Sequence, residues 1–456
     1  MYFMRRILFI SLCLSGFMLS AQSPEAVIRS IYDEALSSRE AYENLRYLCK
    51  TTKGRITGSQ EAALAVEFTR RVMEGLMLDT VYLQEMMVPR WVRGRESASV
   101  QSASIGRRAL SVCSLGLSGS SGEEGLTGSV IEVRSLDELS SMERERVEGR
   151  IVFFNRPMDP TMIQTFAAYG QAVDQRVQGP ALAAGMGAVA ALVRSATTAM
   201  DEVPHTGVTV FGEGQARIPA MAVSTLSADL LSEWLRQDPG LTIHLVNTCR
   251  MDDDVTSYNV VGELRGSVFP EQIITVGGHL DAWDTGEGAH DDGAGCIQSI
   301  EVLRLFRALD IKPRRTIRAV MFMDEEIAHR GAACYFEQAK VKHEIHYAAL
   351  EADRGALSPR SFGFSATPQR EDSLMALSAY FKPYGLSTFT RGGGGADIGP
   401  LAAFGTVLIT FVPDAQRYFD YHHSANDSFE QVHPRELQLG SAAIASLIYL
   451  IDRLDL

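Results

Sequence analysis

The sequence predicts an α/β fold built on a doubly wound, mostly parallel sheet, and three observations carry this prediction. Short apolar runs rich in β-branched residues recur in the second half of the chain, and helical stretches separate them. Acidic residues or histidine follow each run, as expected at the carboxyl edge of such a sheet. A length of 456 residues exceeds one ordinary domain, so a second, smaller domain is also expected.

Four of the apolar runs predict successive strands of this sheet. They lie at residues 272–276, 316–323, 347–350 and about 406–411. Helical spacing of apolar residues over 294–309, and again at Ile444, Leu447 and Ile451, predicts helices that bury one face against the sheet. The alternation of these elements favours the doubly wound arrangement.

The chain divides into four segments. Residues 1–21 are set apart as an export signal, and residues 22–119 are expected to form the N-terminal part of the larger domain. Residues 120–247 have a different texture, with short strands, a helix of small residues and no cluster of candidate ligands. They are expected to form a smaller αβ domain inserted into the larger one. Residues 248–456 resume the first pattern and carry the candidate site.

The first residues have the layout of a cleavable signal peptide. Arg5 and Arg6 precede an apolar stretch at 7–19 that is too short to span a membrane, and a cleavage point follows at Ala21. We therefore expect a secreted or periplasmic protein that has no membrane association after cleavage.

Composition excludes several classes of protein. A formal net charge of −13, without any lysine- or arginine-rich run, argues against a nucleic-acid partner. Hydrophobic residues make up 46% and charged residues 22% of the chain, which is typical of a globular protein. The cysteines show no C-x-x-C spacing, so a zinc ribbon and a thioredoxin motif are excluded.

The stretch 277–295 carries the first candidate site residues. His279 and Asp281 follow the strand at 272–276 with a spacing of two, so both leave it on the same side. A histidine placed this way suits metal binding through one ring nitrogen, with the aspartate orienting the ring or its neighbours. Asp291 follows in a glycine-rich loop that leads into the next helix, whose N-terminus favours a carboxylate.

Three further predicted strands lead to residues of the same kinds. Glu325 and Glu326 follow the second strand, Asp353 follows the third, and His422-His423 lie past the fourth. These groups are costly to bury without partners, and a pair of divalent cations would satisfy them all. Nitrogen and oxygen ligands without a thiolate favour zinc, with cobalt and manganese as alternatives.

A two-metal site that hydrolyses a peptide bond needs one carboxylate that bridges the metals and another that takes the proton from water. Glu325 and Glu326 suit a division of labour, because adjacent residues leaving a strand face different ways. One of these glutamates can coordinate a metal while the other stays free as a base. The sequence pattern alone does not assign the two roles.

Four segments also resemble a known family. GGHLDAWDTGEGAHDDGAG, MDEE, LEAD and YHHSAND resemble the co-catalytic zinc exopeptidases, aminopeptidase-like enzymes with paired zinc, and among them the carboxypeptidase Q type. Stretches at 88–94, 195–207 and 392–398 are similar to that type too, and residues 120–247 resemble its protease-associated domain. The resemblance implies the zinc-exopeptidase fold, dipeptides or short peptides as substrates, and a homodimer.

Carried over residue by residue, the resemblance implies two zinc ions that share one bridging carboxylate. His423 is preferred over His422 as a ligand, because the family's last ligand lies four residues before an aspartate, here Asp427. The implied ligands are His279, Asp291 and Asp353 for one ion, and Asp291, Glu326 and His423 for the other.

The resemblance also assigns the remaining roles. Glu325 would be the general base, and Asp281 would orient His279. Two other classes share the scaffold: a glutaminyl-cyclase-like acyltransferase with one zinc, and a non-catalytic, receptor-like binding module that lacks ligands. All the expected ligands are present in this chain, which favours an exopeptidase, and a metal count would separate it from the cyclase.

Overall fold

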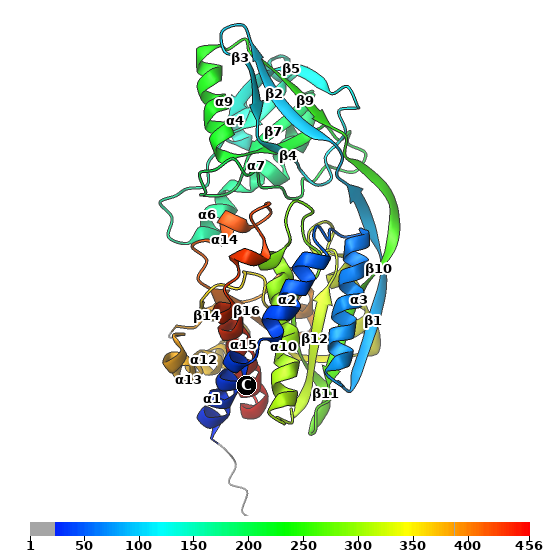
Figure 1. The fold of residues 1–456 in the computed structure, drawn as a ribbon, viewed down its shortest axis with the longest axis vertical. Coiled ribbons are helices and arrows are strands. Elements are labelled where there is room, and N and C mark those ends of the chain that lie inside the picture. Colours follow the sequence, from blue (N-terminus) through cyan, green and yellow to red (C-terminus); the bar gives the residue numbers. More distant parts are fainter. Residues whose placement is uncertain (1–22, 387) are drawn as a thin grey trace, which may run out of the picture.

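Two sheets of eight strands each organise the molecule, one in the lower and one in the upper part of Figure 1. The computed structural model describes residues 23–386 and 388–456, so the predicted export signal at 1–21 lies outside the described residues. The lower sheet has the strand order β1-β10-β12-β11-β13-β16-β14-β15, and the upper sheet the order β3-β2-β9-β5-β6-β7-β8-β4. The predicted α/β class is confirmed.

Parallel strands form the centre of the lower sheet. They are β12 (Arg315–Phe322), β11 (Phe269–His279), β13 (Ile345–Glu351) and β16 (Val407–Pro413). These are the four strands that the apolar runs predicted. Antiparallel pairing places the flanking strands β1 (Thr80–Val92), β10 (Arg250–Leu264) and β14 (Pro359–Ser365), while β15 (Thr390–Arg391) runs parallel to β14 at the edge.

The sequence did not predict the whole of β10, because the strand begins with polar residues. Three consecutive aspartates occupy Asp252–Asp254, and most side chains in the first half of the strand are at least partly exposed. The strand forms there because it pairs along its length with β1, which is a tertiary contact rather than a local preference.

The upper sheet combines a parallel centre with antiparallel edges. Its strands are β2 (Glu96–Ser102), β3 (Gly106–Leu110), β4 (Val112–Ser114), β5 (Leu126–Val133), β6 (Ile151–Phe154), β7 (Ala190–Arg194), β8 (Ala220–Val223) and β9 (Thr242–Asn247). Strands β2, β3 and β4 precede residue 120, where we placed the start of the inserted domain. They nevertheless belong to this sheet, since β2 pairs with β9 and β4 pairs with β8.

Helices cover both faces of the lower sheet. One face carries α1 (Pro24–Ser37), α2 (Glu40–Thr51), α3 (Gln60–Gly75), α10 (Ala294–Ala308) and α15 (Pro434–Leu454), whose buried residues form the main core. The other face carries α11 (Arg330–Lys342) and the 3-10 helix η3 (Gly399–Phe404). The short α12 (Pro368–Ala376) and α13 (Ser378–Phe381) lie near β14.

The upper sheet has its own set of helices. They are α4 (Leu136–Ser140), α5 (Arg144–Val147), α6 (Thr165–Ala172), α7 (Asp174–Val177), α8 (Gly179–Gly185) and α9 (Thr225–Gln237). Two separate apolar clusters pack on this sheet, distinct from the core of the lower one.

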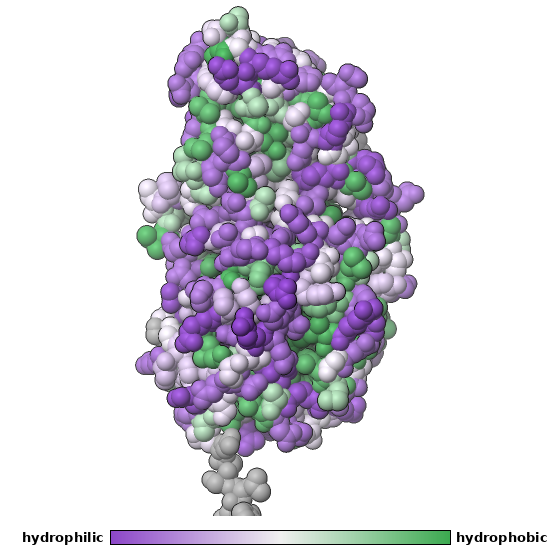
Figure 2. All heavy atoms as spheres, in the orientation of Figure 1, coloured by the Kyte–Doolittle hydropathy of each residue, from purple (hydrophilic) through white to green (hydrophobic). Residues whose placement is uncertain are grey.

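Helix α15 is the one helix of the described residues that is long and apolar enough to cross a membrane. Burial explains its apolar composition, because 83% of its most apolar 18-residue stretch lies inside the protein. Figure 2 shows that hydrophilic residues cover much of the face seen in Figure 1, with hydrophobic residues interspersed among them. The helix therefore belongs to the core, as predicted from its apolar face.

The two parts of the molecule meet beside the carboxyl edge of the parallel strands. Phe166 and Tyr169 from α6 of the upper part stack on Tyr418 and Phe419 of α14 (Tyr418–Tyr421) from the lower part. The ring centroids lie 5.3 Å apart in the first pair and 4.7 Å in the second. This aromatic contact joins α6 to α14, two helices that adjoin in Figure 1, and so places the upper part beside the candidate site.

Candidate metal centre

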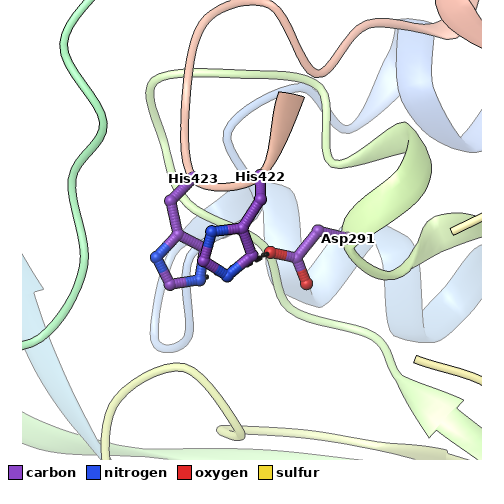
Figure 3. A group of neighbouring side chains, drawn as sticks. All are labelled: Asp291, His422 and His423. Carbon is purple, nitrogen blue, oxygen red and sulfur yellow. Dashed lines mark ion pairs between the residues drawn. The ribbon is translucent and has the colours of Figure 1, made fainter. Parts of the chain in front are cut away.

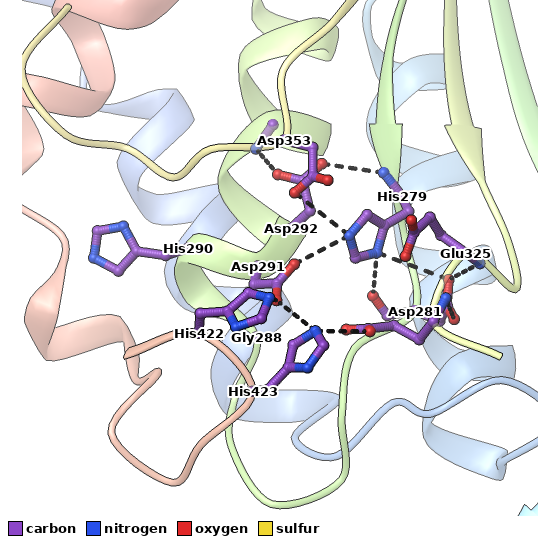
Figure 4. A network of polar contacts seen from close by, with 12 residues as sticks. His279, Asp281, Gly288, His290, Asp291, Asp292, Glu325, Asp353, His422 and His423 are labelled. Carbon is purple, nitrogen blue, oxygen red and sulfur yellow. Dashed lines mark hydrogen bonds and ion pairs between the residues drawn. The ribbon is translucent and has the colours of Figure 1, made fainter. Parts of the chain in front are cut away.

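His279 is the last residue of β11 and stands at the carboxyl edge of the parallel strands. Its ring Nδ1 lies 3.0 Å from the main-chain carbonyl oxygen of Asp281, so the Nδ1–H donates there and Nε2 keeps a free lone pair. Nε2 lies 3.1 Å from Oδ1 of Asp291 and 3.6 Å from Oδ1 of Asp353 (Figure 4). One nitrogen thus faces two carboxylates from different loops.

Asp291 lies beside the stacked rings of His422 and His423 (Figure 3). Its Oδ1 faces His279, and its Oδ2 lies 3.3 Å from Nε2 of His423. The main-chain N–H groups of His290 and Asp291 donate to the carboxylate of Asp427 at 2.7 and 3.0 Å, which fixes this loop. Burial raises the pKa of Asp291 to about 6, because a buried site disfavours the charged form.

The carboxylate of Asp281 holds the turn that carries the two glutamates. It accepts hydrogen bonds from the main-chain N–H groups of Asp324 at 2.8 Å, Glu325 at 3.1 Å and Glu326 at 3.3 Å. The same carboxylate lies 3.9 Å from Nδ1 of His279, beyond hydrogen-bond distance. The carbonyl of Asp281 therefore orients the histidine ring, while its carboxylate joins the ends of β11 and β12.

Glu325 and Glu326 face different surroundings. Oε2 of Glu326 lies 3.1 Å from Nε2 of His423, and the side chain is 3% exposed. The side chain of Glu325 is 17% exposed and lines a cavity, where its carboxylate lies 3.8 Å from Nδ1 of His329. Burial raises the pKa of Glu325 to about 8. Both glutamates line this cavity, but Glu326 faces the candidate ligand His423, whereas Glu325 faces His329.

His422 and His423 are not equivalent, although their rings stack with centroids 3.6 Å apart. Nε2 of His423 lies within 3.3 Å of carboxylate oxygens from both Asp291 and Glu326. Among the carboxylates of the described residues, Nε2 of His422 approaches that of Asp291 alone, at 3.7 Å. Of the two, His423 is therefore the one positioned to share an ion with both carboxylates.

The cluster fits bound cations. Within this cluster, three buried carboxylate oxygens have no hydrogen-bond partner among residues 23–386 and 388–456: Oδ2 of Asp291, Oε1 of Glu326 and Oδ1 of Asp353. A cavity of about 10 Å³, room for one small occupant, is lined by Asp291, Glu326 and His423. Unpaired buried carboxylates are costly, and cations would offset that cost. The nitrogen and oxygen donors suit zinc.

Three residues that shape the site were not assigned a role from the sequence. The buried guanidinium of Arg55 donates to the carbonyl oxygens of Leu280 at 2.6 Å and Gly288 at 2.8 Å, which holds the loop before Asp291. In the sequence, the position of Asp427 was used only to prefer His423 over His422 as a ligand. In the structure, its carboxylate also holds the loop that carries Asp291. Contacts of this kind leave no local pattern to detect.

The third such residue, Thr206, comes from the upper part of the molecule. Its main-chain N–H donates to the carbonyl of His423 at 2.8 Å, and its own carbonyl oxygen lies 3.3 Å from Nδ1 of that histidine. In the tautomer that carries its proton on Nδ1, His423 donates to Thr206, and Nε2 is free for the carboxylate cluster. The adjacent His205 places its Nδ1 2.6 Å from the carbonyl oxygen of His422.

A second cavity of about 300 Å³ opens beside the cluster. Its lining includes Asp291, Glu325, Glu326 and Asp353 from the lower part, and Phe166, Tyr169 and Arg176 from the upper part. Buried histidines and carboxylates around an ion-sized cavity, with a glutamate free beside a larger one, define a metal-dependent hydrolase.

Comparisons with known proteins identify the family. The profile of peptidase family M28 matches residues 259–448. Carboxypeptidase Q from Xenopus laevis is 32% identical over 434 residues, which are 94% of this chain and 90% of that protein. Carboxypeptidase Q from Bos taurus is 30% identical over 428 residues, 93% of this chain and 88% of that protein. The chain belongs to peptidase family M28 and is a zinc peptidase related to carboxypeptidase Q.

Solved structures agree with this assignment. The crystal structure of a peptidase M28 precursor from Shewanella amazonensis superposes with a TM-score of 0.90 at 30% identity, covering 94% of this chain and 96% of that one. A zinc aminopeptidase from Bacillus subtilis, at 18% identity and a TM-score of 0.64, shares the fold over 91% of this chain and 95% of its own. The protein is thus a peptide hydrolase on the fold predicted from its sequence.

Proposed function

We propose that the protein is an exopeptidase that holds two zinc ions and hydrolyses dipeptides or short peptides. The proposal rests on the position of Asp291, whose two carboxylate oxygens face His279 on one side and His423 on the other. His279, Asp291 and Asp353 would hold one ion, and Asp291, Glu326 and His423 would hold the other. The partnerless oxygens of Asp291, Glu326 and Asp353 support this division.

Bound zinc would supply a Lewis acid that polarises the scissile carbonyl and acidifies the attacking water. Glu325 would take the proton from that water and pass it to the leaving amine, since its carboxylate lies outside the ligand cluster and lines the cavity. Asp281 keeps Glu325 in place through its main-chain N–H. The four aromatic rings of the contact between α6 and α14 line the same cavity.

The remaining proposals concern the export and organisation of the chain. Residues 1–21 would be removed on export, which would leave a secreted or periplasmic enzyme without a membrane anchor. The upper sheet would be the inserted protease-associated domain, and its strand pairing favours a start near Glu96 rather than at residue 120. The homodimer implied by the resemblance remains a prediction that light scattering would test.

A panel of dipeptides and aminoacyl arylamides, assayed with and without a chelator, tests the proposed activity. We expect hydrolysis of dipeptides, loss of activity with the chelator, recovery on adding zinc, and about two zinc ions per chain by elemental analysis. A single zinc with cyclisation of glutaminyl peptides would instead favour the cyclase class. Hydrolysis that survives complete removal of the metal would contradict the proposal.

A further inference from the structure

His329 lies on the wall of the 300 Å³ cavity beside the proposed general base, and the proposed mechanism does not use it. It stands between β12 and α11, immediately before the first residue of that helix. A polar side chain at this position often caps the helix, but the side chain of His329 makes no capping hydrogen bond. With 56% of this side chain exposed, the ring is available to another group.

The main chain of His329 is fixed on both sides. Its N–H donates to the carbonyl oxygen of Asp324 at 2.6 Å, and the N–H of Arg330 donates to the carboxylate of Asp324 at 3.2 Å. The φ of His329 is +54°, a left-handed conformation that residues with a side chain adopt at some cost. Gly331 packs so closely on the end of β12 that a Cβ would lie 2.3 Å from the carbonyl oxygen of Met323. The ring of His329 therefore extends from a fixed point.

The carboxylate of Glu325 is held less tightly than its main chain. The main-chain N–H of Glu325 donates to the carboxylate of Asp281 at 3.1 Å. No side chain among residues 23–386 and 388–456 donates a hydrogen bond to the carboxylate of Glu325 itself. His329 is the one basic side chain in that part of the protein that lies within ion-pairing distance of it, with Nδ1 3.8 Å from Oε1. The two groups thus face each other across the cavity wall without being joined.

Small side-chain rotations would join the two groups. A hydrogen bond from an imidazole N–H to a carboxylate measures about 2.7–2.9 Å, so the separation of 3.8 Å is about 1 Å too long. Both side chains can turn about their own bonds while the main chain stays fixed. Hydrogen bonds of catalytic groups are often long before the substrate binds, and a catalytic base is commonly oriented by a third group.

We propose that His329 is a positioning residue for Glu325, whose Nδ1–H donates to one carboxylate oxygen and turns the other oxygen towards the attacking water. This inference rests on the proposed peptidase function. The ring acts in its neutral form, as the tautomer with its proton on Nδ1, so it adds no positive charge beside the proposed ions. No bond is made or broken at His329, and Glu325 alone carries the proton from the water to the leaving amine.

Three substitutions of His329 test this role with the best dipeptide of the panel. His329→Ala removes the donor, and we expect kcat to fall by about 10- to 100-fold with little change in KM, as for loss of a hydrogen bond to a charged group. His329→Asn keeps a donor near the position of Nδ1 and tolerates the left-handed main chain, so it should restore most of kcat. His329→Gln carries its donor one bond further out and should restore less.

The other end of α11 supplies a matched control. His343 is exposed and has the same φ of +54°, but it lines a separate cavity. His343→Ala should therefore leave kcat unchanged. The dependence on the base is measured by combining His329→Ala with Glu325→Gln. Once the base is removed there is nothing left to orient, so the second substitution should lower the residual rate no further.

Several kinetic results would overturn the role of His329 while leaving the proposed activity intact. One is a wild type that hydrolyses dipeptides and a His329→Ala variant with unchanged kcat. A higher KM at unchanged kcat would make His329 a substrate contact instead. A fall in zinc content, or an equal loss in His329→Ala and His329→Asn, would indicate a structural role. A further loss in the double variant would mean that His329 acts on a group other than Glu325.

A crystal structure of the zinc-loaded wild type tests the contact without turnover. We expect Nδ1 of His329 within about 3.2 Å of a carboxylate oxygen of Glu325. A separation above about 3.5 Å would refute the role of His329 whatever the activity. A protein that shows the short contact but hydrolyses no peptide would instead refute the proposed activity and retain the pairing of the two side chains.

Discussion

The lower and upper sheets contribute to the candidate site in different ways. The lower sheet places His279 at the end of a parallel strand, and Glu326 and Asp353 shortly after the ends of two others, where strand pairing fixes the main chain. The upper sheet supplies none of the proposed ligands, but its Thr206 and Arg176 contact His423 from the far side of the ring. The difference indicates that metal geometry depends on one sheet, whereas the shape of the substrate cavity depends on how both parts meet.

Replacing the proposed general base should have the largest effect on activity, and it tests whether the lower sheet carries the catalytic chemistry. We expect Glu325→Gln to lower kcat by about 10²- to 10⁴-fold, the usual contribution of a general base. Zinc content and Tm should stay at wild-type values, because the side chain keeps its size and lies outside the ligand cluster. Steady-state kinetics measure kcat, elemental analysis measures the zinc content, and thermal unfolding measures Tm. Glu337→Gln, at an exposed position of α11, is the control. Full activity in Glu325→Gln would exclude Glu325 as the general base.

The next largest effect should distinguish the two stacked histidines. His423→Ala is expected to lose about one zinc per chain and at least about 100-fold in kcat/KM, because its Nε2 faces both Asp291 and Glu326. His422→Ala should keep both ions and lose less activity, since its Nε2 approaches only Asp291 at 3.7 Å. Metal analysis after dialysis is the measurement. The reverse pattern would make His422 the ligand.

A substitution in the upper part should have a smaller effect and would sharpen the comparison. Gly207→Ala places a Cβ 2.3 Å from the guanidinium carbon of Arg176. We expect a roughly tenfold lower kcat/KM for dipeptides and a loss of about 1–3 kcal/mol in unfolding free energy. Gly214→Ala is the matched control, because Gly214 also has a positive φ, +73°, but has no atoms near its Cβ position. Equal activity in the two variants would mean that the cavity tolerates a shift of Arg176.

The smallest effect on activity is expected far from the site. Glu344 lies just before β13, at the amino ends of the parallel strands, 2.8 Å from Arg318 and 3.2 Å from His346. Burial opposes its ionisation, but hydrogen bonds from these two residues lower the pKa of Glu344 to about 2. A carboxyl whose pKa is lower in the folded state stabilises the protein above its ordinary pKa. That contribution is lost as pH falls from about 4.5 towards 2.

Glu344→Gln should therefore remove about 2–3 kcal/mol of unfolding free energy at pH 7 and flatten its decline between pH 5 and 2. Hydrolysis at pH 7 should not change, since the site lies at the opposite ends of the strands. Denaturant unfolding at several pH values measures the first effect and kinetics the second. A wild-type pH profile of stability in the variant would show that this ion pair contributes nothing.

Local signals in the sequence were sufficient to predict the strands at the centre of the lower sheet. Each of β11, β12, β13 and β16 contains a short apolar run, as expected of a parallel strand that is buried on both faces. The first half of β10 lacks such a run and exists through its pairing with β1. The composition of the sequence likewise does not reveal that β2 and β4, which precede residue 120, pair with β9 and β8 of the upper sheet.

The sequence by itself determined which chemical groups follow each strand, and with them the class of site. Their order along the chain is enough, because the carboxyl ends of parallel strands meet at one edge. Only the tertiary structure decided how the histidine pair is oriented and which cation reaches the cavity. Thr206 lies 217 positions before His423, and Arg176 lies 247 positions before it. Contacts over such separations arise from the packing of two sheets, which no local pattern of residues encodes.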